Sequence, residues 1–120
     1  MKAKTLWLVF AGGAIGSIAR AFITTFGADV WATLAVNIVG AAVLGLVQTA
    51  PRFAGEDRQA FWATGFCGGF TTLSAVVLIT VFAKTDDTGV ALAYVLANIV
   101  FGIAAYAAFS RVGRSRGAKA

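Results

Sequence analysis

The sequence contains no histidine, one cysteine (Cys67), one proline (Pro51) and five acidic residues. Without histidine, the chain lacks the side chain that most often acts as a general base or a metal ligand near neutral pH. A lone cysteine forms neither a disulfide framework nor a thiolate metal cluster within one chain. The sequence also shows no nucleophile–base pair, carboxylate dyad or phosphate-binding loop. These absences argue against an enzyme.

Charge is also scarce, and apolar residues take its place. Charged residues make up 12% of the 120, hydrophobic residues make up 59%, and the mean hydropathy is +0.84. A soluble chain of this length would expose most of its surface to water and would aggregate with this composition. A lipid-embedded chain has the opposite requirement, and glycine, of which there are 14, lets its helices approach closely. The composition predicts an all-α membrane protein in which residues 1–120 form a single domain.

Four apolar segments each approach the ~20 residues that a helix needs to cross a bilayer. They are residues 6–26, 31–47, 61–82 and 90–109. Pro51 follows the second segment, where its missing N–H does not interrupt a helix. Three tryptophans, Trp7, Trp31 and Trp62, fall at segment ends, as in the aromatic belts of membrane proteins. The pattern predicts four transmembrane helices joined by residues 27–30, 51–59 and 84–89.

The distribution of basic residues predicts an orientation in the membrane. On a soluble domain the formal charge of +5 would suggest nucleic-acid binding. With four spans, however, both termini and residues 51–59 share one side, which holds eight basic residues: Lys2, Lys4, Arg52, Arg58, Arg111, Arg114, Arg116 and Lys119. Lys84 is alone on the other side, beside Asp29, Asp86 and Asp87. Because loops rich in Lys and Arg stay in the cytoplasm, we expect a multi-pass protein of the cell membrane, with both termini cytoplasmic and no nucleic-acid partner.

The third apolar segment is interrupted at its centre. Gly68 and Gly69 stand before Phe70, which is followed by Thr71 and Thr72. Glycine and threonine are weak helix formers, so we expect the third helix to be broken there. Backbone groups freed at membrane depth are tolerated only where they face a cavity, an ion or another chain. Freed carbonyls can bind a cation such as Na⁺ together with those of a second subunit, whereas a close glycine crossing of two helices is the alternative.

The remaining polar groups of the spans lie on helical faces. Arg20 is the only charge inside a span, and it either reaches towards the interface, anchors a neighbouring subunit or attracts anions. Asn37 lies in the second span and Asn98 in the fourth. Each either forms a hydrogen bond to a neighbouring helix or lines a polar path. Asn98 shares its face with Tyr94, one turn earlier. The hydroxyls of Thr71, Thr72 and Ser74 are able to donate hydrogen bonds to an anion in place of water.

Three stretches resemble the CrcB/Fluc fluoride channels. They are residues 12–20 (GGAIGSIAR), 33–40 (TLAVNIVG) and 65–74 (GFCGGFTTLS), of which the third is the most specific. The resemblance covers essentially the whole chain in order. It implies an antiparallel dimer of four-helix subunits with two narrow fluoride pores and a structural Na⁺ at the dimer centre.

The resemblance also implies roles for individual residues. Carried over by position, Asn37 faces a pore, Arg20 lies near its vestibule, and the backbone carbonyls of Gly68 and Thr71 hold the Na⁺. Ser74 and Asn98 lie on a polar track along the pore. Together with the neighbouring hydroxyls, the predicted pore residues are Asn37, Thr72, Ser74, Tyr94 and Asn98.

This chain departs from the family pattern at two positions. The family's TTFSTF run carries two phenylalanines whose ring edges contact fluoride, and here the run reads TTLSAV, with Leu73 and Val76 in their places. Aliphatic side chains have no comparable positive edge. Because the charge bias also favours a single orientation, we expect a heterodimer with a paralogous subunit of opposite topology rather than a homodimer.

The sequence therefore predicts a fluoride-selective channel subunit that exports F⁻ passively and lowers its cytoplasmic concentration. One alternative is an accessory membrane subunit without its own pore. Another is a small multidrug exporter, which also has four helices but needs a membrane-embedded glutamate for proton coupling. No Asp or Glu lies inside any of the four predicted spans.

Overall fold

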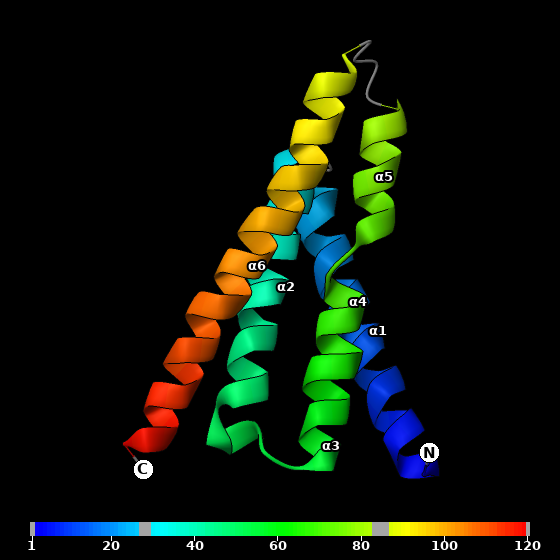
Figure 1. Ribbon diagram of the computed structural model, residues 1–120. Coiled ribbons are helices and arrows are strands. Elements are labelled where there is room, and N and C mark those ends of the chain that lie inside the picture. Colours follow the sequence, from blue (N-terminus) through cyan, green and yellow to red (C-terminus); the bar gives the residue numbers. More distant parts are fainter. Residues whose placement is uncertain (1, 27–29, 83–86, 120) are drawn as a thin grey trace.

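A computed structural model describes residues 2–26, 30–82 and 87–119, and this part of the chain contains helices and no strand (Figure 1). Its elements are α1 (Ala3–Thr25), α2 (Val30–Thr49), the 3₁₀ turn η1 (Pro51–Phe53), α3 (Glu56–Gln59), the π-helix η2 (Ala60–Cys67), α4 (Gly68–Phe70), α5 (Leu73–Phe82) and α6 (Thr88–Ala118). Four stretches are long and apolar enough to cross a membrane, and the third combines α3, η2, α4 and α5. The prediction of an all-α protein with four transmembrane helices is confirmed.

Most large apolar side chains of the described residues lie on the outside, as a lipid environment requires. Trp7 is 70% exposed and Phe22 is 66% exposed, whereas the fully buried large side chains are the valines Val36, Val47 and Val76. A soluble protein rarely exposes apolar patches of this extent. The four helices therefore present their apolar surface to lipid and keep a thin core of small residues between them.

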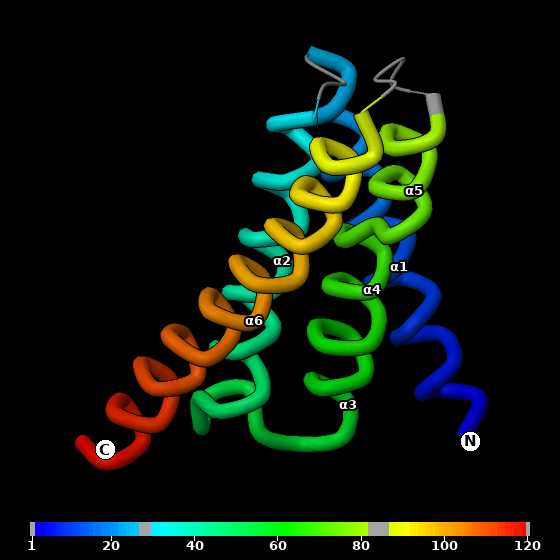
Figure 2. Tube along the Cα trace, turned by 45° about the horizontal axis from the view of Figure 1, so that its top comes forward, coloured from blue at the N-terminus to red at the C-terminus, as the bar shows by residue number. Residues whose placement is uncertain are grey.

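Helices that follow one another in the sequence are not the main packing partners. α1 packs chiefly against η2 and α4, and α2 packs against α6 (Figures 1 and 2). In the first pair, a Cβ on Gly12 would overlap the backbone carbonyl of Phe61, and one on Gly16 would overlap that of Phe66. A Cβ on Gly69 would likewise overlap the backbone of Gly13. These glycines form a packing face, because any larger residue would push the two backbones apart.

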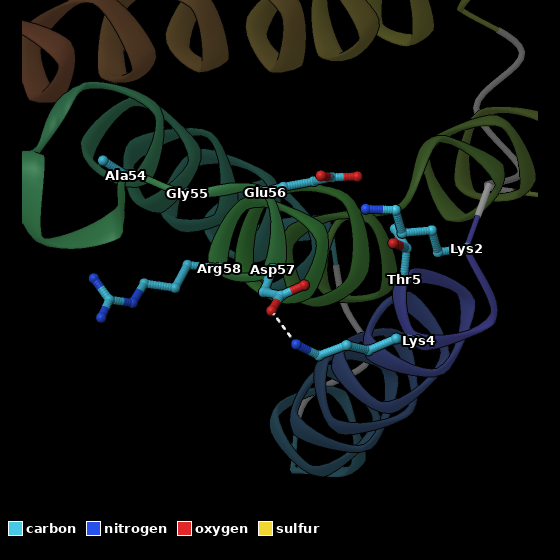
Figure 3. Close-up of a pocket in the computed structure, with 8 residues that line it drawn as sticks. All are labelled: Lys2, Lys4, Thr5, Ala54, Gly55, Glu56, Asp57 and Arg58. Carbon is cyan, nitrogen blue, oxygen red and sulfur yellow. Dashed lines mark hydrogen bonds and ion pairs between the residues drawn. The ribbon is translucent and has the colours of Figure 1, made fainter.

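Both described ends of the chain and the segment from η1 to α3 lie at the same end of the molecule, which we call the terminal end (Figure 1). Residues 27–29 of the predicted connection 27–30 and residues 84–86 of the predicted connection 84–89 lie outside the described residues, and these include Asp29, Lys84 and Asp86. At the terminal end, Lys4 at the start of α1 forms an ion pair with Asp57 of α3 (Figure 3).

The fourth helix is longer than its apolar segment. The prediction ended the fourth span at residue 109, but α6 continues through the basic residues to Ala118. Arginine is a good helix former, and basic residues near a helix C-terminus interact favourably with its dipole. The extension also packs on other elements, since a Cβ on Gly113 would overlap Thr49, and one on Gly117 would lie 3.0 Å from Cγ of Pro51. With 31 residues, α6 is about 46 Å long and exceeds the ~30 Å hydrocarbon core.

Candidate functional site

The third crossing is broken at Thr71 and Thr72, between α4 and α5. Thr71 has an extended backbone (φ −79°, ψ 157°), which turns the chain out of the helix. Its N–H still donates to the carbonyl of Cys67 (3.0 Å), as does its hydroxyl (2.9 Å). Thr72 then starts α5, because its Oγ1 accepts the N–H of Ala75 at 3.1 Å in the manner of a helix N-cap. The predicted break in the third helix is therefore confirmed, and it is located at the two threonines.

Asn37 of α2 binds the backbone that the break exposes. Its Oδ1 accepts the N–H of Thr72 at 2.8 Å, and its Nδ2 donates to the carbonyl of Thr72 at 3.0 Å. In a continuous helix that N–H would donate to the carbonyl of Gly68 instead. The amide thus replaces the helical partner of the Thr72 N–H and adds a donor to the carbonyl of the same residue. Only a side chain with both a donor and an acceptor can do this.

The same amide joins α2 to α6. Nδ2 of Asn37 also donates to Oδ1 of Asn98 at 2.9 Å, and Nδ2 of Asn98 donates to the carbonyl of Tyr94 at 2.9 Å. Both donor hydrogens of Asn37 are therefore in use. The two predicted pore amides form one hydrogen-bonded chain that runs from the break in the third crossing into α6.

Helix α1 supplies donors to the other side of the break. Nη1 of Arg20 donates to the carbonyl of Thr71 at 3.0 Å, and Oγ of Ser17 donates to the carbonyl of Gly69 at 3.3 Å. Arg20 is half-buried in this position. This hydrogen bond holds the guanidinium beside the break. It therefore favours the interpretation of Arg20 as a fixed charge in the site over the interpretation that its side chain only reaches towards the membrane surface.

Two cavities flank the break, and Thr72 lines both of them. The first has a volume of about 400 Å³, and its polar lining consists of Arg20, Thr24, Thr33, Thr72 and Ser74. The second has a volume of about 330 Å³ and contains Asn37, Asn98, Thr71 and Thr72 together with apolar residues, including Leu73 and Val76. The break therefore brings polar side chains from four helices to two faces of one threonine.

The electrostatics of the break differ between its two sides. Helix α5 begins at Leu73, and its N-terminus carries a partial positive charge. The guanidinium of Arg20 adds a full positive charge nearby. The end of α4 presents carbonyl groups with a partial negative charge. Because no group of three or more His, Cys, Asp or Glu capable of holding a metal occurs among the described residues, a cation here would depend on backbone carbonyls. The positive charge of Arg20 and of the α5 N-terminus suits a small anion.

Most of the predicted site residues lie together, but two stand apart. Arg20, Asn37, Thr71, Thr72, Ser74 and Asn98 all line one of the two cavities. The hydroxyl of Tyr94 instead donates to the carbonyl of Val30 at 2.9 Å, and Tyr94 lines neither cavity. Gly68 is exposed, and a Cβ added to it would meet nothing within 4 Å, so it faces away from the described part of the subunit.

The sequence analysis missed three hydroxyl residues of the site. Thr24 and Thr33 line the first cavity, and Ser17 binds the carbonyl of Gly69. A signal was present, because Thr24 follows Arg20 by four residues and Thr33 precedes Asn37 by four. Residues four apart share a helical face, so each hydroxyl extends a face that already held a predicted site residue.

Comparison with known proteins gives one matching family and several relatives that share the same kind of name. Residues 7–109 match the family described as CrcB-like protein, Camphor Resistance (CrcB). A "Fluoride-specific ion channel FluC" of Agrobacterium fabrum is 38% identical over 119 residues, covering 90% of this chain and 94% of the relative. A protein of the same name from Allorhizobium ampelinum is 39% identical over 121 residues, covering 92% of this chain and 97% of the relative. "Fluoride-specific ion channel FluC 1" of Mycolicibacterium paratuberculosis is 37% identical over 113 residues, covering 85% of this chain and 84% of the relative.

Proposed function

This chain belongs to the CrcB family, and we propose that it is a subunit of a fluoride-selective ion channel. The relatives named as fluoride channels align with it over most of both chains. The observation that carries the proposal is the polar break at Thr71 and Thr72 in an otherwise apolar crossing, where the hydroxyls of Thr72 and Ser74 and the guanidinium of Arg20 line one cavity.

The chemistry of the break suits a small, strongly hydrated anion. Such an ion leaves water only if donors replace its hydration shell. The hydroxyls of Thr72 and Ser74 lie 3.2 Å apart in the first cavity, and the guanidinium of Arg20 lines the same cavity. We infer that these groups pass fluoride between them and that the Asn37–Asn98 pair keeps the second cavity polar.

Passive export needs only the membrane potential. Fluoride enters cells as neutral HF and dissociates at neutral pH, so the anion is trapped inside. A potential that is negative inside drives a monovalent anion outward with about 2.3 kcal/mol per 100 mV. A proton-coupled drug exporter would instead need an acid within the membrane, and residues 3–25, 30–49, 60–82 and 88–118 contain neither Asp nor Glu. The sequence therefore supports a channel over an exporter.

Cells that lack this protein should become hypersensitive to fluoride, and the effect should be strongest in acidic medium, where more HF forms and enters. Growth of deletion and parent strains across fluoride concentrations at two pH values measures this. Chloride tolerance serves as the control and should not change. Equal fluoride tolerance in the two strains, when no second channel gene is present, would rule out the proposed function.

We further propose that the protein lies in the cell membrane with its termini in the cytoplasm. The support is the concentration of eight basic residues in the two terminal segments and residues 51–59. This arrangement places Arg111, Arg114 and Arg116 on the cytoplasmic extension of α6.

We also propose a structural Na⁺ between two subunits, held by the carbonyls of Gly68 and Thr71. Gly68 faces outward, and the N–H of Thr72 that would bind its carbonyl in a continuous helix donates to Asn37 instead. The carbonyl oxygen of Thr71 accepts from Arg20 with one lone pair, and its second lone pair would bind the cation. Backbone carbonyls are suitable ligands for a hard cation.

Gly68→Val should abolish the stabilisation of the dimer by Na⁺. Because a Cβ on Gly68 meets nothing within 4 Å, the added bulk does not disturb the described part of the subunit itself. Dimer dissociation in detergent, measured with Na⁺ and with a large organic cation, checks this prediction. Thr64→Val is the matched control, because it places the same side chain at an exposed position four residues before Gly68, about one turn away. A Gly68→Val dimer as responsive to Na⁺ as the control would contradict the carbonyl site.

Finally, we propose that the working channel is a heterodimer with a paralogous subunit of opposite orientation. The charge bias favours one direction of insertion, whereas an antiparallel dimer needs two. Leu73, which replaces a family phenylalanine, is 72% exposed and is therefore accessible to a partner subunit.

A further inference from the structure

A pocket at the terminal end has no role in the proposed channel. It lies between the end of α2, η1, η2 and the basic extension of α6, and its volume is about 480 Å³. Its lining includes Leu46, Pro51, Arg52, Phe53, Trp62 and Arg116. The pocket thus combines two cationic side chains with an apolar and aromatic wall.

Packing between four elements builds this pocket. The guanidinium carbon of Arg52 lies 5.4 Å from the centre of the Phe53 ring, and that ring meets Trp62 edge-on at 6.0 Å. Gly117 lies against Pro51, which brings the end of α6 to η1 and sets Arg116 beside the pocket. Arg52 therefore lies against an aromatic ring. Arg116 is brought to the pocket because α6 continues past its apolar segment.

The two arginines have no acidic partner in the described part of the chain. The single ion pair found there joins Lys4 to Asp57. Figure 3 shows Glu56 and Asp57, the acidic residues of this end, in a neighbouring cavity with Lys2 and Lys4. No carboxylate lines the pocket of Arg52 and Arg116. Its charge is therefore best balanced by an anion from outside the chain.

The position of the pocket identifies the anion as amphipathic. Its wall joins apolar residues near the end of α2 to Arg116, which lies in the basic extension of α6 beyond the apolar segment that ends at Phe109. Trp62 in its wall is 36% exposed, and tryptophan favours the level of the lipid headgroups. Basic pockets between membrane helices at this level are suited to phospholipid headgroups.

We propose that this pocket binds one anionic phospholipid. The phosphate lies between Arg52 and Arg116, and the glycerol and upper acyl chains lie along Trp62 and Leu46. The lipid would hold the extension of α6 against η1 at the membrane surface. This site is independent of fluoride conduction, so its failure and that of the channel proposal are separate results.

Quenching of Trp62 fluorescence by brominated lipids tests the proposal. The full-length chain with Trp7→Phe and Trp31→Phe keeps Trp62 as its one tryptophan, and both replaced side chains are largely exposed. It is reconstituted in vesicles of phosphatidylcholine and phosphatidylglycerol in which one or the other lipid is brominated. Each arginine should favour the anionic lipid about fivefold, so we expect the two together to give a preference for phosphatidylglycerol of about 25-fold at Trp62.

Two double variants separate a site from general surface charge. Arg52→Gln with Arg116→Gln should reduce the preference to near one. Arg111→Gln with Arg114→Gln removes the same charge from exposed positions of the same extension that do not line the pocket, and should keep the preference. Equal losses in the two variants, or no preference in the parent, would overturn the proposal.

Two further measurements complete the test. Millimolar inorganic phosphate should leave the lipid preference unchanged, and its loss would indicate a site for a water-borne anion, against the proposal. Native mass spectrometry of the unsubstituted chain should detect one retained phosphatidylglycerol, which the Arg52/Arg116 variant loses. Retention by that variant would also overturn the assignment.

Discussion

Replacing Asn37 with aspartate should abolish fluoride efflux while the protein still inserts in the membrane. Nδ2 of Asn37 donates to the carbonyl of Thr72 and to Oδ1 of Asn98, both of which are acceptors. An ionised aspartate would place a third acceptor, with a negative charge, against these two oxygens. The same charge would repel an anion in the neighbouring cavity. Aspartate would still accept the N–H of Thr72, but the carbonyl of Thr72 and Oδ1 of Asn98 would both lose their donor.

The expected decrease in efflux is on the order of a hundredfold, since an acceptor left without its donor costs about 1–3 kcal/mol and two acceptors lose their donor. Efflux from liposomes of the functional complex, followed with a fluoride electrode, measures it. Gln48→Glu is the matched control on the same helix, about 16 Å along its axis. Oε1 of Gln48 accepts from the hydroxyl of Tyr106, a role that glutamate keeps. Unchanged efflux in Asn37→Asp would reduce Asn37 to a packing residue.

The second large effect concerns the partner. Liposomes that contain this chain alone should show no fluoride efflux above protein-free vesicles, and liposomes with its paralog added should show robust efflux. Antiparallel assembly requires subunits of both orientations, and eight basic residues against Lys84 favour one orientation here. Leu73 and Val76 also offer no ring edge to an anion in the cavity that they line.

The control for this result is a protein-free vesicle and a vesicle of the paralog alone, each loaded with the same fluoride gradient. Accessibility of a C-terminal tag from the two sides of the membrane gives an independent readout. Robust efflux from this chain alone would refute the heterodimer. So would a tag that is found equally on both sides.

The break in the third crossing could be predicted because its cause is local. Adjacent glycines and threonines disfavour a helix wherever they stand, and the break appears at Thr71 and Thr72. The sequence predicts both Asn37 and Asn98 as site residues, but it could not predict the hydrogen bond between them. Helical periodicity gives the face on which a residue lies but not the helix that this face meets.

Tyr94 illustrates the same limit. Its face, shared with Asn98, predicts a place in the pore, and the structure shows that its hydroxyl donates to the carbonyl of Val30. A long side chain reaches a partner about a turn away from its own Cα, which spacing alone does not reveal. Arg20 could have reached the membrane surface, and its bond to Thr71 depends on the close glycine contact between α1 and the third crossing.

The pairing of α1 with the third crossing and of α2 with α6 has a consequence for biogenesis. Neither of the first two helices meets its main partner until two later segments have been synthesised. Translation adds roughly 5–20 residues per second, so α2, which ends at Thr49, waits on the order of several seconds for α6, which ends at Ala118. During that time the glycine face of α1 and the inner face of α2 contact lipid or the insertion machinery. Assembly is therefore a late step: the pair of α1 with the third crossing closes only after that crossing has been made, and the pair of α2 with α6 closes only after α6 has been made.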